Sequence, residues 1–142
     1  MSEVERVERA VAELFAAFRR KRGREQAVGG DLSGTQLRAL DGLAEVGQAT
    51  ARQLADYADV TPATMTGMLD SLEAKGVIRR ERSLTDRRAM QIVLTDQGAA
   101  MAAEARERWR RRWQEAMADV PPEELEAAIR VIGKAAGLFD AM

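Results

Sequence analysis

Residues 61–80 read TPATMTGMLDSLEAKGVIRR, and they predict a helix that is followed directly by a strand. Thr61 predicts a helix N-cap, and Pro62 suits the first helical position because the N–H that proline lacks has no partner there. Apolar side chains then recur at helical spacing and predict one buried face: Met65, Met68, Leu69 and Leu72. Gly76 predicts the end of this helix, and the β-branched pair Val77-Ile78 predicts the start of a strand.

Two shorter helices with their own start signals precede this stretch. Ser33 with Gln36, and Thr50 with Gln53, fit the capping box, in which two side chains satisfy backbone N–H groups reciprocally. Gly47 predicts the end of the first of these helices. Their apolar positions are Leu37, Leu40, Leu43 and Ala44, then Leu54, Ala55 and Tyr57. Three short helices joined by tight turns are typical of a helix-turn-helix unit.

The hydrophobic period changes after the helix that begins at Thr61. Residues 77–82 and 90–94 contain β-branched side chains and predict two strands. The polar residues 83–88 lie between them and predict the tip of a β-hairpin. The expected fold class is therefore mainly α with a small β-hairpin (α+β).

Long helices are expected on both sides of this central part. The first begins with the capping box Ser2–Glu5 and ends at Gly23. Thr95 predicts the start of a second long helix, and Pro121-Pro122 separates it from a last one. The apolar faces of these helices are too long for the small central unit to cover. We therefore expect a second copy of the chain to bury them.

The composition of the 142 residues excludes several classes of function. The chain contains no cysteine and no histidine, which excludes disulfides, thiol chemistry and the usual zinc sites. No nucleophile–base set, phosphate loop or metal-ligand cluster occurs, so we expect neither an enzyme nor a cofactor. No apolar run approaches the roughly 20 residues that span a bilayer, and the charged N-terminus does not resemble a signal peptide. We expect a cytoplasmic protein with no membrane partner.

A formal net charge of -1 hides separate basic clusters. Residues 75–88 contain six basic and two acidic side chains, and residues 19–25 and 106–112 each contain five basic and one acidic. A basic cluster attracts the dense phosphate charge of a duplex whatever the total charge is. Any single run also fits a solvated helix face. The cluster at 75–88 differs because it lies on the hairpin directly after the helix from Thr61.

Three motifs occur at the spacing of a known family: LEAKGVIRR at 72–80, TDRR at 85–88 and VLTDQG at 93–98. With them, residues 32–98 resemble the winged helix-turn-helix of the multiple-antibiotic-resistance regulator (MarR) family. The resemblance implies a homodimer that binds double-stranded DNA and responds to a small molecule. It implies an N-terminal dimerisation helix at 1–30, a DNA-binding domain at 31–98 and C-terminal dimerisation helices at 99–142.

The helix from Thr61 is the expected recognition helix, because the second helix of such a unit enters the major groove. Its expected DNA contacts are small or polar: Thr61, Pro62, Ala63, Thr64, Thr66, Gly67 and Ser71. Hydroxyl and methyl groups contact several bases, but the set has no Arg, Lys, Asn or Gln, so DNA shape is expected to supply part of the specificity. Gly67 departs from the family, where a larger residue is common, and puts one contact in doubt.

The resemblance also places DNA contacts on the wing. Asp86 and Arg88 are two residues apart, so an extended chain directs them to one side. We expect Asp86 to hold an arginine in place while an arginine at the tip enters a minor groove. The resemblance assigns this role first to Arg88 and then to Arg87, with Arg80 as a further contact. The alternative is a solvated hairpin tip with a weak ion pair.

A ligand pocket is a further expectation. Phe15 and Arg19, like Trp109 and Trp113, are each one helical turn apart. In the family, phenolic or aromatic acids bind between the dimer helices and the DNA-binding unit, so these four residues are pocket candidates, with Arg19 meeting a carboxylate. Alternatively, the tryptophans form interface core and Arg19 lies on the surface.

The expected function is that of a homodimeric repressor that binds a pseudo-palindromic operator, with half-sites roughly 10 bp apart, and is released by a small aromatic ligand. Two alternatives stay open. One is an architectural or activating DNA-binding protein of low sequence specificity. The other is a protein-interaction module in which the wing is incidental.

Overall fold

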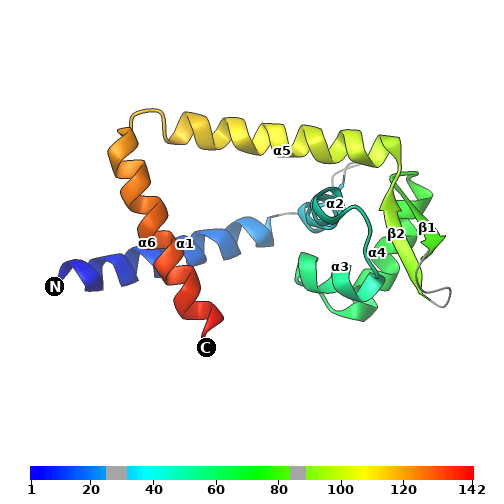
Figure 1. The fold of residues 1–142 in the computed structure, drawn as a ribbon, viewed down its shortest axis with the longest axis horizontal. Coiled ribbons are helices and arrows are strands. Elements are labelled where there is room, and N and C mark those ends of the chain that lie inside the picture. The colour runs from blue at the N-terminus through cyan, green and yellow to red at the C-terminus, as the bar shows by residue number, and fades with distance from the viewer. Residues whose placement is uncertain (25–31, 84–88) are drawn as a thin grey trace. The chain divides into compact units, whose positions relative to one another are not determined.

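The computed structural model of the chain describes residues 1–24, 32–83 and 89–142 (Figure 1). Within these residues, six helices and one two-stranded hairpin follow in the order α1 (Glu3–Gly23), α2 (Gly34–Val46), α3 (Ala51–Ala58), α4 (Pro62–Ala74), β1 (Ile78–Arg82), β2 (Met90–Leu94), α5 (Asp96–Ala116) and α6 (Pro122–Asp140). The predicted fold class, mainly α with a small β-hairpin, is confirmed. The chain separates into two units, Met1–Ala105 and Arg106–Met142.

Side chains cap the starts of the helices in the first unit. Three predicted capping boxes are confirmed: Ser2–Glu5, Ser33–Gln36 and Thr50–Gln53. At the start of α4, the Thr61 hydroxyl accepts a hydrogen bond of 3.2 Å from the Thr64 N–H. At the start of α5, the Thr95 hydroxyl accepts one of 3.1 Å from the Gly98 N–H. Each bond satisfies a backbone donor that has no partner inside the helix.

Residues with positive φ follow the three inner helices. Gly47 ends α2 with φ 85°, and Gly76 follows α4 with φ 74°, as predicted. Asp59 ends α3 with φ 56° and is the one non-glycine residue with positive φ in the described part of the chain. α1 ends at Gly23 as predicted, but its C-cap is Arg24 in a right-handed conformation and not Gly23.

One apolar core joins α2, α3, α4 and the hairpin. Its largest buried side chains are Leu40, Leu43, Leu54, Met65, Leu69, Leu72, Val77, Ile78 and Ile92. Tyr57 differs from the prediction, since its side chain is largely outside the core and its hydroxyl donates a hydrogen bond to Glu45. Ala58, one turn after Leu54, fills the core position instead.

The hairpin is bonded to the helical part of the first unit. β1 and β2 are antiparallel, with Ile78 opposite Leu94. On the other edge of β2, Ile92 N–H donates to the carbonyl oxygen of Ala49 at 2.7 Å, and Ala49 N–H donates back to Ile92 at 3.2 Å. The connection between α2 and α3 therefore holds the hairpin by backbone hydrogen bonds.

The start of α5 lies against the base of the hairpin. The Thr95 hydroxyl donates to the carbonyl of Gly76 at 2.6 Å, and the Thr95 N–H donates to the carbonyl of Val77 at 3.2 Å. A Cβ atom built on Gly98 would lie 1.9 Å from the carbonyl oxygen of Val77. Only glycine fits at this position, which explains the last residue of the VLTDQG motif.

Two helices keep their apolar side chains outside any core. Neither α1 nor α6 contains a buried residue. Their exposed large apolar side chains include Val4, Leu14, Phe15, Phe18, Ile129, Ile132, Leu138 and Phe139. None of the helices in residues 1–24, 32–83 and 89–142 is long and apolar enough to cross a membrane.

Candidate nucleic-acid interface

α3, the turn after it and α4 form the predicted helix-turn-helix. The positive φ of Asp59 reverses the chain, and the Val60 N–H donates to the carbonyl of Ala55 at 3.0 Å to close the end of α3. Thr61 then begins α4. Because Leu54 on α3 and several residues of α4 are buried in the same core, the two helices are held as one body.

The outward face of α4 consists of small side chains. Met65, Leu69 and Leu72 form the buried side of the helix, and at 100° per residue Ala63, Gly67 and Ala74 point to the opposite side. The predicted contacts Thr61, Pro62, Ala63, Thr64, Thr66 and Gly67 are all exposed, and Ser71 is half-buried.

Gly67 lies in open space. A Cβ atom added to it would meet no atom within 4 Å apart from its own helix and chain neighbours, and its φ is not positive. Neither packing nor backbone conformation within the described chain therefore requires glycine there. In the middle of a helix, glycine is less favourable than alanine by about 1 kcal/mol.

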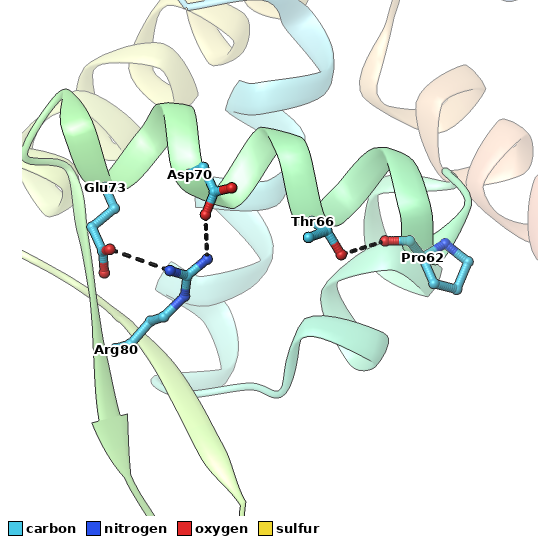
Figure 2. A network of polar contacts seen from close by, with 5 residues as sticks. All are labelled: Pro62, Thr66, Asp70, Glu73 and Arg80. Atoms are coloured by element: carbon cyan, nitrogen blue, oxygen red, sulfur yellow. Dashed lines mark hydrogen bonds and ion pairs between the residues drawn. The ribbon is translucent and has the colours of Figure 1, made fainter.

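Two threonine hydroxyls, at the start and in the middle of α4, donate hydrogen bonds within the helix itself. Thr61 Oγ1 donates to Thr64 Oγ1 at 3.0 Å. Thr66 Oγ1 donates to the carbonyl oxygen of Pro62 at 3.0 Å (Figure 2). A hydroxyl that donates internally still has lone pairs that accept hydrogen bonds. Thr61 and Thr66 therefore offer acceptors and methyl groups to a partner, a set that suits base amino groups and thymine methyls.

Arg80 lies between the hairpin and α4. Its Nη2 is 3.0 Å from Asp70 Oδ1 and its Nη1 is 3.2 Å from Glu73 Oε1, so one guanidinium bridges two carboxylates of α4 (Figure 2). Sequence reasoning expected Arg80 to contact DNA and missed both partners. The sequence does contain a signal for this contact: Asp70 and Glu73 are three residues apart, so they lie on one side of the helix. They precede the basic cluster at 75–88 and were left out of its charge count.

The other described cations of the hairpin region differ in their pairing. Arg79 Nε lies 2.6 Å from Glu81 Oε1 on the other face of β1. Lys75 and Arg82 form no ion pair with any residue of the described part of the chain. The positive charge that faces solvent here is thus smaller than a count of basic residues suggests. The predicted wing-tip residues Asp86, Arg87 and Arg88 lie outside the described residues.

The four candidate pocket residues lie in two units. Phe15 and Arg19 are exposed on α1 in the first unit. Trp109 and Trp113 lie on α5 in the second, where their rings meet edge to face with centroids 6.1 Å apart and planes at 77°. A single pocket that joins the two pairs stays a prediction.

A charged contact connects α1 to the turn of the helix-turn-helix. Arg22 Nη1 lies 2.8 Å from Asp59 Oδ2. The hydrogen bond from Arg22, followed by its charge and that of Arg38, lowers the pKa of Asp59. Sequence reasoning did not find this pair, because its members are 37 residues apart.

No group of three or more carboxylates that could hold a metal ion occurs in the described ranges.

Comparison with known proteins identifies the same winged helix-turn-helix. The model of the MarR family matches residues 32–90. A MarR family transcriptional regulator of Silicibacter pomeroyi is 26% identical with a TM-score of 0.64, covering 94% of this chain and 84% of its own.

Two further solved structures share the fold at lower identity. FabT of Streptococcus pneumoniae, solved in complex with DNA, is 20% identical with a TM-score of 0.75, covering 98% of this chain and 99% of its own. BpsR of Bordetella bronchiseptica, whose DNA binding is regulated by 6-hydroxynicotinic acid, is 20% identical with a TM-score of 0.66. The match covers 90% of this chain and 98% of BpsR. The helices and the hairpin thus have the arrangement of winged-helix transcriptional regulators.

Proposed function

We propose that this chain, whose residues 32–90 match the model of the MarR family, is a DNA-binding transcriptional regulator of that family and acts as a cytoplasmic, homodimeric repressor of a pseudo-palindromic operator. Members of this family are DNA-binding proteins and not enzymes, so we expect no catalytic activity of this chain. The observation that carries the proposal is the outward face of α4. A helix with its side chains is about 10–12 Å across and the major groove is about 12 Å wide, so small side chains at Ala63 and Gly67 favour a deep fit.

Phosphate contacts are the second part of the proposal. Lys75 caps the end of α4 and Arg82 ends β1. Neither side chain is paired with a carboxylate within the described residues. We assign further contacts to Asp86, Arg87 and Arg88, on the resemblance of their motif to the family's wing. Contacts of this kind position the protein on the duplex, and α4 reads the bases.

The apolar faces of α1 and α6 support the homodimer. Side chains such as Phe18 on α1 and Ile132 on α6 are exposed within a single chain, and burial against a second copy would remove them from water. Two copies of α4 would then lie about 34 Å apart, one turn of DNA. In this proposal residues 1–30 and 99–142 form the dimerisation part, and residues 31–98 form the DNA-binding domain.

Release by a small aromatic acid completes the proposed function. Its support is the regulation of BpsR by 6-hydroxynicotinic acid and the spacing of Phe15 with Arg19 and of Trp109 with Trp113. A ligand releases DNA only if it binds the DNA-incompetent dimer more tightly than the competent one. Titration of tryptophan fluorescence with salicylate-like compounds tests this part, and an unchanged spectrum would contradict it.

The main test is selection of bound sequences from a pool of random duplexes. Wild-type protein is expected to enrich an inverted repeat, and Ala63→Glu is expected to bind it at least about tenfold more weakly because a carboxylate then faces the phosphates. Ala44→Glu, the same change at an exposed position of α2, is the matched control and should bind like wild type. Equal affinity for all duplexes would favour the architectural alternative, and no binding would favour a protein-interaction module.

A further inference from the structure

Arg80 is placed toward α4 by the register of the hairpin. It lies opposite Ile92 on the neighbouring strand, and directly opposed residues of an antiparallel pair point to the same face. Ile92 is buried in the core, and so is Ile78, two residues before Arg80 on the same face of β1. The Arg80 side chain therefore begins at the edge of the core and extends along α4.

The partners of Arg80 lie along one side of α4. Thr66, Asp70 and Glu73 follow one another at helical spacing, and the guanidinium contacts the second and third of them (Figure 2). The Arg80 side chain is 31% exposed, against 68% for Asp70 and 43% for Glu73. A planar guanidinium serves two carboxylates with separate nitrogens, whereas a lysine ammonium acts as a single point charge.

From this geometry we infer that Arg80 is a positioning residue for DNA binding and not a phosphate contact. It ties β1 to α4 and so fixes the distance between the hairpin and the recognition helix. It also neutralises Asp70 and Glu73, two carboxylates that would otherwise repel the phosphates beside the groove. This inference rests on the proposed function, and it assigns Asp70 and Glu73 to the DNA-binding apparatus although both are acidic.

The test is the effect of removing the acidic partners. If Arg80 contacted phosphate, Asp70→Asn with Glu73→Gln would release it and remove two negative charges, and binding would tighten. If Arg80 positions the hairpin, the same double variant weakens binding to the selected operator by about tenfold, as Arg80→Ala does. The variant that combines all three changes is then no weaker than Arg80→Ala alone, because the contact is lost only once.

Two controls separate positioning from general charge and folding effects. Arg79→Ala removes the neighbouring cation, whose ion-pair partner among the described residues is Glu81 on β1. The loss of affinity that it causes should therefore add to the loss caused by Asp70→Asn/Glu73→Gln. Arg80→Lys should bind between wild type and Arg80→Ala, because lysine retains one of the two ion pairs. Far-ultraviolet circular dichroism and thermal melting should match wild type for all variants, since exposed ion pairs add little to folding stability.

The outcomes are distinct. If wild type binds the operator, two results would overturn the positioning role alone. One is tighter binding by Asp70→Asn/Glu73→Gln, and the other is a loss of affinity in this variant that adds to the loss caused by Arg80→Ala. A wild type that binds no DNA would overturn the proposed function and this role together. Weaker and non-additive binding supports both.

Discussion

Arg22 Nη1 donates a hydrogen bond of 2.8 Å to Asp59 Oδ2, which joins the last turn of α1 to the turn between α3 and α4. α1 is the helix that we assign to the dimer, and the turn leads into α4, the helix that we propose reads the DNA. In this proposal the bond directly connects, within the first unit, a dimerisation helix with the DNA-binding part. Asp59 is 81% exposed, so we expect a small contribution to stability.

The lowered pKa of Asp59 gives this contact a defined pH dependence. An aspartate whose pKa is lower in the folded state stabilises the fold above its unfolded pKa of about 3.9, and this stabilisation is lost as the pH falls through the folded pKa. Asp59→Asn should therefore be slightly less stable than wild type from about pH 8 to about pH 5, and the difference should shrink below about pH 4.

Urea unfolding at several pH values measures this difference. Asparagine also adopts positive φ readily, so Asp59→Asn leaves the backbone unstrained. Asp56→Asn, an exposed change on the same helix, is the matched control. A difference between Asp59→Asn and wild type that stays constant down to about pH 2 would show that the contact with Arg22 does not stabilise the fold.

Gly98→Ala should destabilise the protein strongly. The added Cβ would lie 1.9 Å from the carbonyl oxygen of Val77, so either α5 or the base of the hairpin must shift. We expect the free energy of unfolding to fall by about 2–4 kcal/mol in denaturant titrations. Gly67→Ala on α4 is the control, because its Cβ meets nothing within 4 Å and should not destabilise. Equal stability of Gly98→Ala and wild type would contradict the contact.

Gly67→Ala should separate stability from DNA binding. The Cβ enters open space, so the free energy of unfolding should rise by about 0.5–1 kcal/mol. Operator affinity should nevertheless fall, because the new methyl group projects from the face that we propose enters the groove. Melting temperature and fluorescence anisotropy with labelled operator measure the two effects. If affinity stays equal to that of wild type, the centre of this face does not approach DNA closely.

Ile132→Glu should prevent dimerisation. Ile132 on α6 is 60% exposed in the single chain, and a charge in an apolar interface is strongly unfavourable. Sedimentation equilibrium at micromolar concentration should give a dimer for wild type and a monomer for the variant. Lys134→Glu, a charge reversal at an exposed position of the same helix, should leave the dimer intact. A monomeric wild type would refute the assignment of α6.

Local signals explain why most of the fold could be predicted from the sequence. The capping pair Ser33–Gln36 lies within four residues, and Gly47 ends the same helix by its own conformation. The exposed face of α4 follows from the spacing of its apolar residues. Such features depend on neighbours along the chain and require no knowledge of tertiary contacts.

The features that the sequence did not reveal depend on residues distant along the chain. Arg80 finds its partners on a helix seven and ten residues earlier, after the chain has turned, and Arg22 meets Asp59 across 37 residues. Tyr57 fits the apolar pattern of α3 but lies at its edge beside Glu45. Pairing of this kind follows from packing, so a count of local charge overstated the free positive charge near the hairpin.

In the proposed complex, two copies of α4 read one operator. Hydroxyl-radical footprinting of wild-type protein on the DNA enriched by selection measures this arrangement. We predict protection with two-fold symmetry, in two half-sites about 10 bp apart, at a ratio of two chains per site. A single asymmetric patch of protection, or uniform weak protection along the duplex, would contradict this account of the protein.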